Sequence, residues 1–216
     1  DIDPDLAEDP STRMQEFEAL VTRTHEVGLK VVLDFVPNHV ARQYHSDTAP
    51  EGVDDLGAHD NKEMHFSPSN NFYYIPRQAF TPQFYIGEGE DRYFEYPAKA
   101  TGNDCFGAFP GEYDWYETVK LNYGVDYTGG GRCHFDPIPD TWYKMLDILL
   151  FWCGKGVDAF RCDMAHMVPV EFWNWAISKV KENYPSVIFI AEIYDQALYR
   201  VYIEKGKFDY LYDKVG

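Results

Sequence analysis

Three charged residues lie inside two segments that otherwise have the composition of buried strands. Arg161 and Asp163 belong to residues 156–163, and Glu192 belongs to residues 187–194. Because side chains alternate along a strand, Arg161 and Asp163 are expected to point to the same side. A buried carboxylate is costly to desolvate, so carboxylates at such positions are candidates for chemistry.

The surroundings of these two carboxylates predict different pKa values. The guanidinium of Arg161 is expected to hold Asp163 ionised, whereas the apolar neighbours of Glu192 are expected to raise its pKa. Two carboxylates whose pKa values are pushed apart suit the nucleophile and the acid/base of a retaining glycosidase. For either strand taken alone, a structural Arg–Asp pair or an unrelated glutamate is the better interpretation.

A third apolar run, residues 29–36, is followed by Asn38 and His39 and contains Asp34. The polar residues of the three segments resemble, in order, the motifs of the α-amylase family, glycoside hydrolase family 13: Asp34, Asn38, His39, Arg161, Asp163 and Glu192. Residues 120–123, Lys-Leu-Asn-Tyr, resemble a further motif of that family. Four motifs in the right order make the resemblance specific, although no single one would suffice.

The resemblance implies a fold and a division of the chain. It implies an α/β fold, a partial TIM (β/α)8 barrel of about strands 3 to 6, with an irregular B domain inserted after strand 3. Residues 1–40 would form helix 2 and strand 3, residues 41–140 the B domain, and residues 141–216 helix 3 to strand 6. The sequence itself supports the division, because residues 41–140 are rich in Gly, Pro, Asn, Asp and aromatic residues and lack long periodic runs.

The resemblance also implies roles for individual residues. Asp163 would be the nucleophile and Glu192 the acid/base. The other predicted substrate-binding residues are His39, Arg161, Asp34, His166 and Asn122. His166 stands where the family commonly has a Lys-His pair, so its part in acceptor binding is the least secure. Asn38 is the candidate ligand of a structural calcium ion, with Asp54, Asp55 and Asp60 as possible further ligands. No redox or organic cofactor is implied.

Two family segments are not found in the 216 residues. The first two barrel strands would precede Asp1, and the fourth motif, with a third carboxylate, would follow Gly216. We therefore expect a piece of a longer enzyme, and we expect the piece alone to be inactive.

Residue patterns between the motifs predict the remaining elements. Thr12 and Gln15 could form a capping box at the start of the first predicted helix. The predicted helices span residues 11–26, 142–153, 169–184 and 196–205. Further strands are predicted at residues 72–76, 84–87 and 208–213. Since strands and helices alternate outside the insert, the strands should be parallel.

Composition limits the partners. The net charge is −17, from 36 acidic and 19 basic residues. No basic patch stands out, which argues against nucleic acid or an anionic membrane as partner. The most apolar stretch, residues 145–153, is too short to cross a bilayer. The four cysteines form no C-x-x-C pair, so the redox compartment and the localisation stay open, as does the oligomeric state.

The sequence thus predicts a retaining glycosidase that acts on α-1,4-glucans, such as starch or maltooligosaccharides. The alternative is a transglycosylase on the same scaffold, either a glucanotransferase or a maltosyltransferase. A non-catalytic carbohydrate-binding homologue is a third reading, which the presence of both Asp163 and Glu192 disfavours.

Overall fold

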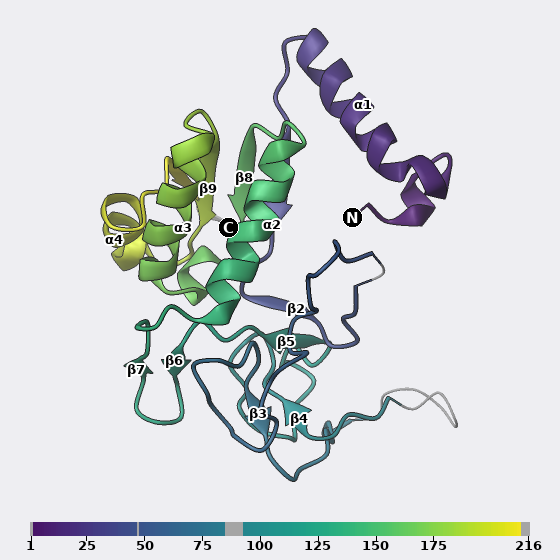
Figure 1. Cartoon of the computed structure of the whole chain (residues 1–216). Coiled ribbons are helices and arrows are strands. Elements are labelled where there is room, and N and C mark those ends of the chain that lie inside the picture. The colour runs from purple at the N-terminus through teal and green to yellow at the C-terminus, as the bar shows by residue number, and fades with distance from the viewer. Residues whose placement is uncertain (1, 47, 85–92, 213–216) are drawn as a thin grey trace. The chain divides into compact units, whose positions relative to one another are not determined.

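The computed structural model describes residues 2–46, 48–84 and 93–212 of the chain (Figure 1). The chain divides into two compact units. The first unit consists of Asp1–Phe35 and Met145–Gly216, and the second consists of Val36–Lys144. Each unit is described separately below. The assignment of residues 41–140 to a B domain remains a proposal.

The helices of the described residues are η1 (Pro4–Leu6), η2 (Pro10–Thr12), α1 (Arg13–Glu26), α2 (Asp140–Gly154), η4 (Ala165–Met167), α3 (Val170–Asn183), η5 (Gln196–Leu198) and α4 (Tyr199–Glu204). The strands are β1 (Val32–Phe35), β2 (His39–Ala41), β3 (Tyr74–Ile75), β4 (Ala98–Lys99), β5 (Thr118–Lys120), β6 (Val125–Asp126), β7 (Arg132–Cys133), β8 (Ala159–Cys162), β9 (Ile188–Glu192) and β10 (Tyr210–Tyr212).

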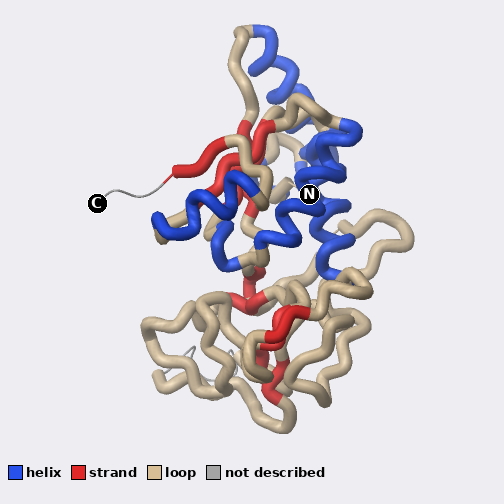
Figure 2. Tube along the Cα trace, turned by 90° about the vertical axis from the view of Figure 1, so that its left-hand side faces the viewer, coloured by secondary structure: helices blue, strands red, loops and turns tan. Residues whose placement is uncertain are grey.

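The first unit is built on a parallel sheet with strand order β1-β8-β9-β10. The chain therefore has an α/β fold, and the parallel strands predicted from the alternation of elements are confirmed. Helix α3 lies alongside the sheet (Figures 1 and 2). Its buried Trp173 contacts the rings of Phe35 and Phe208, with centroids 6.2 and 4.7 Å away. The buried core of this unit thus lies between the sheet and α3.

Helix α3 follows Pro169 and ends at Asn183, close to the predicted limits. Helix α1 begins as expected, but the predicted capping box is wrong. Thr12, at the N-cap, makes no side-chain hydrogen bond to the helix backbone. Its hydroxyl donates to Glu16, and Glu16 also accepts the backbone N–H groups of Glu8 and Asp9. A carboxylate one turn into the helix therefore organises this end by reaching back to the preceding chain.

The predicted strand that includes Asp34 is shorter than its apolar run. β1 ends at Phe35, and His39 begins β2, which pairs antiparallel with β5 in the second unit. Pro37 has no N–H group and therefore interrupts the ladder between these two strands. The apolar run thus contributes to both units.

The second unit contains three two-stranded antiparallel sheets and long connecting loops. Its interior is aromatic: the Tyr73 ring lies 5.3 Å from the Phe106 ring and 5.8 Å from the Tyr127 ring. The predicted short strand at residues 72–76 is present as β3. Of the predicted strand at residues 84–87, residues 85–87 lie outside the described residues, as does Asp213 of the last predicted strand.

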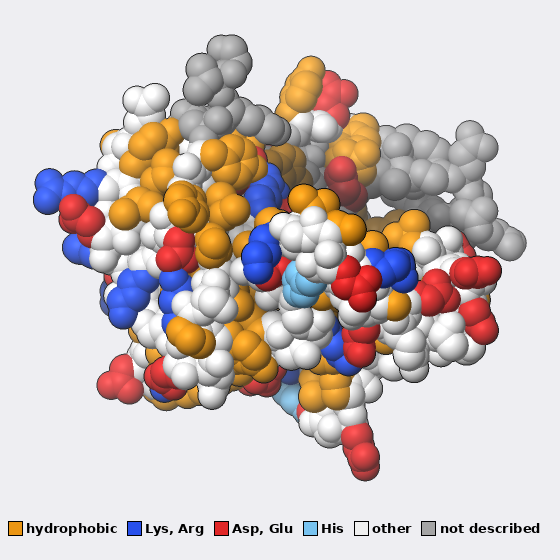
Figure 3. All heavy atoms as spheres, turned by 90° about the horizontal axis from the view of Figure 1, so that it is seen from above, with side chains coloured by type: hydrophobic (Ala, Val, Ile, Leu, Met, Phe, Trp, Pro, Cys, Tyr) orange, Lys and Arg blue, Asp and Glu red, His pale blue; other side chains and the backbone are white. Residues whose placement is uncertain are grey.

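The described surface shows no segment with the features of a membrane span, since none of its helices is both long and apolar enough. On the face seen in Figure 3, basic side chains are scattered among acidic and apolar ones and are not gathered into one patch.

Candidate active site

The carboxyl ends of β1, β8 and β9 bring four predicted site residues together in the first unit. The register pairs Asp34 with Arg161, and β9 lies beside β8 with Arg161 opposite Ile190. Asp163 directly follows β8, and Glu192 is the last residue of β9. Carboxyl ends of adjacent parallel strands form one edge, which is why residues distant in sequence meet here.

One guanidinium contacts all three carboxylates of this edge. Arg161 Nη1 lies 2.7 Å from Asp34 Oδ1 and 2.8 Å from Asp163 Oδ1, and Nη2 lies 2.7 Å from Glu192 Oε2. These carboxylates differ in access, because the Asp34 side chain is 59% exposed and that of Glu192 only 2%. A single guanidinium can reach Asp163 and Glu192 together only if the two carboxyl groups are close to each other.

Glu192 does not have the environment that the sequence suggested. Burial acts to raise its pKa, but hydrogen bonds from the Met164 backbone N–H and the Tyr194 hydroxyl, together with the charge of Arg161, lower the pKa to about 2. The Met164 N–H lies 3.0 Å from Oε2, and the Tyr194 hydroxyl lies 2.8 Å from Oε1. The predicted raised pKa of Glu192 is therefore wrong, because polar donors from other positions surround the carboxylate.

Asp163 is also shifted opposite to the prediction. Burial raises its pKa, and the neighbouring Glu192 carboxylate adds to this, while the bond to Arg161 acts against both. In the free chain the pair thus favours a proton on Asp163 and a charge on Glu192. The predicted ionised state of Asp163 is wrong for this substrate-free arrangement.

Three residues of this site were not predicted from the sequence. Tyr194 donates to Glu192, and Tyr212 accepts a hydrogen bond from Arg161 Nε at 2.7 Å. Met164 has a left-handed backbone, with φ of 44°, which points its N–H at Glu192. Such a backbone is strained for a residue with a side chain and is often found at functional sites. The two tyrosines could have been noted, since each lies on or directly beyond a strand that carries or neighbours the motifs.

His166 lies in η4, directly beyond the Asp163 segment. Its ring centroid is 5.9 Å from that of Tyr194. Its Nδ1 atom is buried and has no hydrogen-bond partner among the described residues. An imidazole nitrogen without a partner can bond a hydroxyl group, which keeps His166 a candidate for substrate binding.

His39 lies in the second unit, where it pairs with Lys120 of β5. Its ring makes an edge contact with the ring of Trp115, with centroids 5.3 Å apart. Burial, and then the charge of Lys120, lower the pKa of His39, which favours the neutral imidazole. Its contact with a sugar stays a prediction.

Asn122 has a structural environment. The side chain is fully buried, its Nδ2 donates to the Ser67 carbonyl, and its Oδ1 accepts the Gly124 N–H, both at 2.8 Å. A side chain without exposed surface offers nothing to a substrate, so the predicted contact between Asn122 and substrate is not carried further.

The groups around Asn38 do not fit a calcium ion. Asn38 Oδ1, the atom that would bind the metal, accepts a hydrogen bond from the Lys120 ammonium at 2.8 Å, and Nδ2 donates to Gly102 O. Calcium requires about six to eight oxygen ligands. Both Asp60 carboxylate oxygens accept hydrogen bonds within the chain. Within residues 2–46, 48–84 and 93–212, no three acidic, histidine or cysteine side chains gather as metal ligands.

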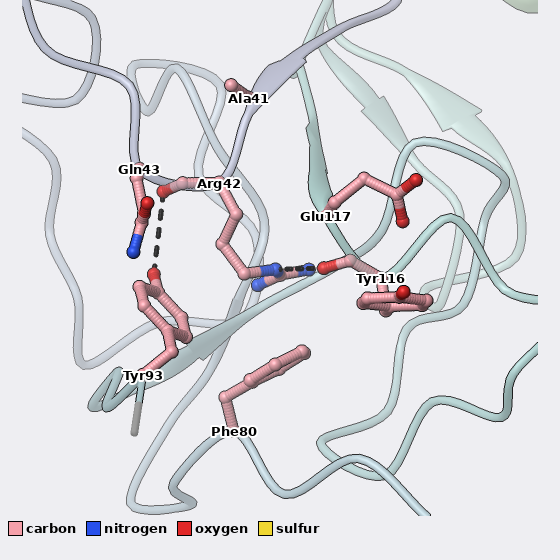
Figure 4. A pocket seen from close by; sticks show the side chains of 7 residues that line it. All are labelled: Ala41, Arg42, Gln43, Phe80, Tyr93, Tyr116 and Glu117. Atoms are coloured by element: carbon pink, nitrogen blue, oxygen red, sulfur yellow. Dashed lines mark hydrogen bonds between the residues drawn. The ribbon is translucent and has the colours of Figure 1, made fainter. Parts of the chain in front are cut away.

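A separate cavity of about 310 Å³ lies in the second unit, lined by Ala41, Arg42, Gln43, Phe80, Tyr93, Tyr116 and Glu117 (Figure 4). The Arg42 guanidinium bonds the Tyr116 carbonyl and the Glu95 carboxylate, and it stacks 4.1 Å from the centroid of Phe80. Its donors are therefore engaged within the protein. The cavity brings together none of the predicted site residues.

Comparison with known proteins adds to this geometry. The chain is 49% identical over 186 residues to an α-1,4-glucan:maltose-1-phosphate maltosyltransferase of Corynebacterium pseudotuberculosis, covering 84% of the chain and 19% of that protein. It is 41% identical over 91 residues to the maltosyltransferase of the same name from Cereibacter sphaeroides, covering 39% of the chain and 15% of that protein. The chain thus spans less than a fifth of the length of these relatives. No model of a protein family matches it.

Solved structures show the same fold. The α-amylase of Geobacillus thermoleovorans in complex with acarbose is 18% identical with a TM-score of 0.53, covering 93% of this chain and 34% of that one. The maltogenic amylase from S. marinus is 19% identical, also with a TM-score of 0.53, covering 92% and 26%. The ordered motifs, the sequence relatives and the shared fold lead to one conclusion. The chain belongs to the α-amylase family, glycoside hydrolase family 13, and spans a part of that family's domain.

Proposed function

We propose that this chain supplies the nucleophile and the acid/base of a retaining enzyme that acts on α-1,4-glucans. The observation that carries the proposal is the joint contact of Arg161 with Asp163 and Glu192 at the ends of β8 and β9. Retaining enzymes need their two carboxyl groups about 5–5.5 Å apart, and two carboxylates that share one guanidinium satisfy this need for proximity.

In the proposed reaction, an Asp163 oxygen attacks the anomeric carbon as the bond from that carbon to the leaving oxygen breaks. Glu192 gives its proton to the leaving oxygen, and a glycosyl ester of Asp163 results. Glu192, now ionised, then takes a proton from the incoming hydroxyl group while that oxygen displaces Asp163. Arg161 and Asp34 would orient Asp163, and His39 and His166 would bind the sugar.

The proton distribution of the free site places a condition on this mechanism. The free pair favours a proton on Asp163, whereas the reaction needs it on Glu192. A bound glucan would exclude water from the edge and bring its glycosidic oxygen to Glu192. We therefore propose that substrate binding reverses the distribution, since interacting carboxylates titrate as a pair and not as independent groups.

The incoming hydroxyl group distinguishes the two candidate activities. Water would give hydrolysis, as in an amylase. The hydroxyl group of a glucan would give transfer, and the curated relatives, named as maltose-1-phosphate maltosyltransferases, favour this second candidate. Both use the same carboxylates, so the site described above supports them equally.

We also propose that the first unit is part of a (β/α)8 barrel and that residues 41–140 are the B domain inserted after its third strand. The sheet face opposite α3 supports the first assignment. It carries apolar side chains that are only partly covered among the described residues, with Val32 48% and Ile188 37% exposed. In a closed barrel such side chains fill the interior.

A chimera tests the function. The matching segment of the Corynebacterium relative is replaced by this chain, and the product is incubated with maltooligosaccharides, with and without maltose 1-phosphate. Phosphate release with chain extension would identify a transferase, and new reducing ends would identify a hydrolase. Asp163→Asn should lower either activity roughly a thousandfold or more. Unchanged turnover in that variant would refute the proposal.

A second variant tests the acid. Glu192→Gln should reduce turnover of natural glucans by about 10² to 10⁴, because the leaving oxygen is no longer protonated. Maltosyl fluoride, whose leaving group needs less protonation, should be affected much less in the step that forms the glycosyl ester. Equal losses on both substrates would count against Glu192 as the acid.

A further inference from the structure

The buried amino group of Lys120 lies at the position where the resemblance places a calcium ion. Lys120 ends β5 opposite His39, and its side chain is only 2% exposed. Buried lysine side chains are rare unless they are paired. The surroundings of this group therefore need an explanation that the proposed reaction does not give.

The contacts of the Lys120 ammonium are those of a coordinated cation. Its Nζ lies 2.8 Å from Asn38 Oδ1 and 2.6 Å from Asp104 Oδ1. The ring of Tyr127 lies on a further side, with its centroid 5.3 Å away. An amide oxygen, a carboxylate and an aromatic face each attract positive charge.

The loop that provides the carboxylate is shaped for this contact. Asp104 has a left-handed backbone with φ of 71°, which residues with side chains rarely adopt. Its N–H donates to Thr101, and the neighbouring Gly102 carbonyl accepts from Asn38. The Gly102–Asp104 loop is thus attached to Asn38 twice, once directly and once through the ammonium.

We propose that Lys120 is a built-in cation, which takes the place of calcium between Asn38 and the Gly102–Asp104 loop, so that the second unit needs no metal there. The ammonium occupies the Asn38 oxygen that a metal would use, and a divalent ion beside it would be repelled. The proposal does not depend on which glucan reaction the chain takes part in.

The built-in cation has a consequence for His39. The two residues are paired across β2 and β5, and the charge of Lys120 adds to burial in lowering the pKa of His39. Unlike a metal, the lysine cannot be removed by a chelator. The fixed charge therefore keeps the imidazole neutral wherever the chain is folded and Lys120 is protonated.

Calcium titration of the unaltered chain is the direct test. The chain is stripped with EDTA, and binding of CaCl₂ is measured by calorimetry together with the melting temperature in EDTA and in CaCl₂. We expect no saturable binding and melting temperatures that agree within error. Binding of one calcium ion per chain that raises the melting temperature, and that Asn38→Ala abolishes, would overturn the proposal.

Chemical rescue tests the cation itself. Lys120→Ala leaves the oxygens of Asn38 and Asp104 facing a vacated space. Butylammonium should raise the melting temperature of this variant saturably, whereas butanol at the same concentration should not. Lys99→Ala serves as the control, because Lys99 reaches Glu95 at 3.4 Å while remaining partly exposed. Equal responses of the two variants to butylammonium would contradict the proposal. The calcium titration decides the matter if Lys120→Ala does not fold.

Discussion

Arg161 is the single residue on which the charge balance of the candidate site depends. It neutralises one of the three carboxylates that it contacts, those of Asp34, Asp163 and Glu192. The remaining two negative charges favour uptake of a proton by one of the buried pair. The donors on Glu192 direct that proton to Asp163. Residues outside the motifs thus determine which motif residue is charged.

Tyr194→Phe should raise the pKa of Glu192, because the ionised carboxylate loses the hydroxyl that donates at 2.8 Å. The folded pKa of about 2 lies below the unfolded value of about 4.3, so Glu192 contributes stability above pH ~4.3 that is lost as the pH falls toward 2. The variant should lose about 0.5–1.5 kcal/mol at neutral pH. Carbon NMR of glutamate-labelled chain measures the pKa, and urea unfolding measures the stability.

Tyr113→Phe is the matched control for this experiment, since Tyr113 is exposed on a loop of the second unit. It should leave the Glu192 titration and the unfolding free energy unchanged. A Glu192 titration that is the same in Tyr194→Phe and in the unaltered chain would show that the tyrosine hydroxyl does not stabilise the ionised carboxylate.

The sequence identified the site residues but not their electrostatics. Ala191 and Ile193, the neighbours of Glu192 in the chain, point to the other side of the strand. Their apolar character therefore says little about what surrounds the carboxylate. Its true neighbours, Met164 and Arg161, come from the adjacent strand end. Which donors meet there depends on register, which spacing within one strand does not contain.

At the scale of elements, Asp158 joins the starts of β1 and β8, as suits a structural residue. Its carboxylate accepts the Val31 N–H at 2.8 Å and contacts His25 at 2.7 Å and Lys30 at 3.0 Å. Asp158→Asn should destabilise the chain by about 1–3 kcal/mol at pH 7, because an amide cannot accept all these bonds. Urea unfolding measures the difference.

The difference should depend on pH. Burial acts to raise the pKa of Asp158, but the bonds from Val31, His25 and Lys30 outweigh it and lower the pKa. Stability from a carboxylate with a lowered folded pKa is present above its unfolded pKa of about 3.9 and is lost below it. The variant and the unaltered chain should therefore converge in acid. Asp147→Asn, on the exposed face of α2, is the control and should show neither effect.

Gly102 determines how closely its loop approaches β2 and β5. A Cβ atom at this position would lie 2.7 Å from Thr118 Oγ1 and 2.9 Å from His39 Cβ. Gly102→Ala should therefore displace the loop from His39 and destabilise the chain by about 1–3 kcal/mol. Thermal unfolding measures the loss, and the histidine NMR signals report the movement. Gly107→Ala, where a Cβ would meet nothing within 4 Å, should be close to neutral.

Elements bounded by local signals were predictable, and those decided by distant partners were not. Pro169 and Pro185 delimit α3, whose observed range is Val170–Asn183. In contrast, the run around Asp34 gave no sign that β1 stops at Phe35. That limit depends on the pairing of His39 with Lys120, some eighty residues away. The second unit, with its short strands and long loops, has few periodic patterns from which to predict.

At the scale of the whole molecule, the parallel sheet has two open edges among the described residues. β1 pairs only with β8, and β10 only with β9. Nearby apolar side chains are exposed, including those of Leu29, Val32 and Tyr210. An open edge with apolar neighbours is a template for pairing with another chain. A closed barrel would have no such edges.

We therefore expect the isolated chain to associate with itself and to be inactive. Pairing through β1 or β10 would cover the exposed edges and should give dimers or larger species whose fraction rises with concentration. Light scattering after size exclusion measures this, and Val32→Lys, which places a charge beside the β1 edge, should weaken it. Maltooligosaccharides should remain unchanged, because the chain spans less than a fifth of its curated relatives and the Arg161 edge lacks the cover that excludes water from a glucan site. A monomer with a cooperative melt that cleaves or extends maltooligosaccharides would contradict both expectations. It would also show that the described units suffice for catalysis.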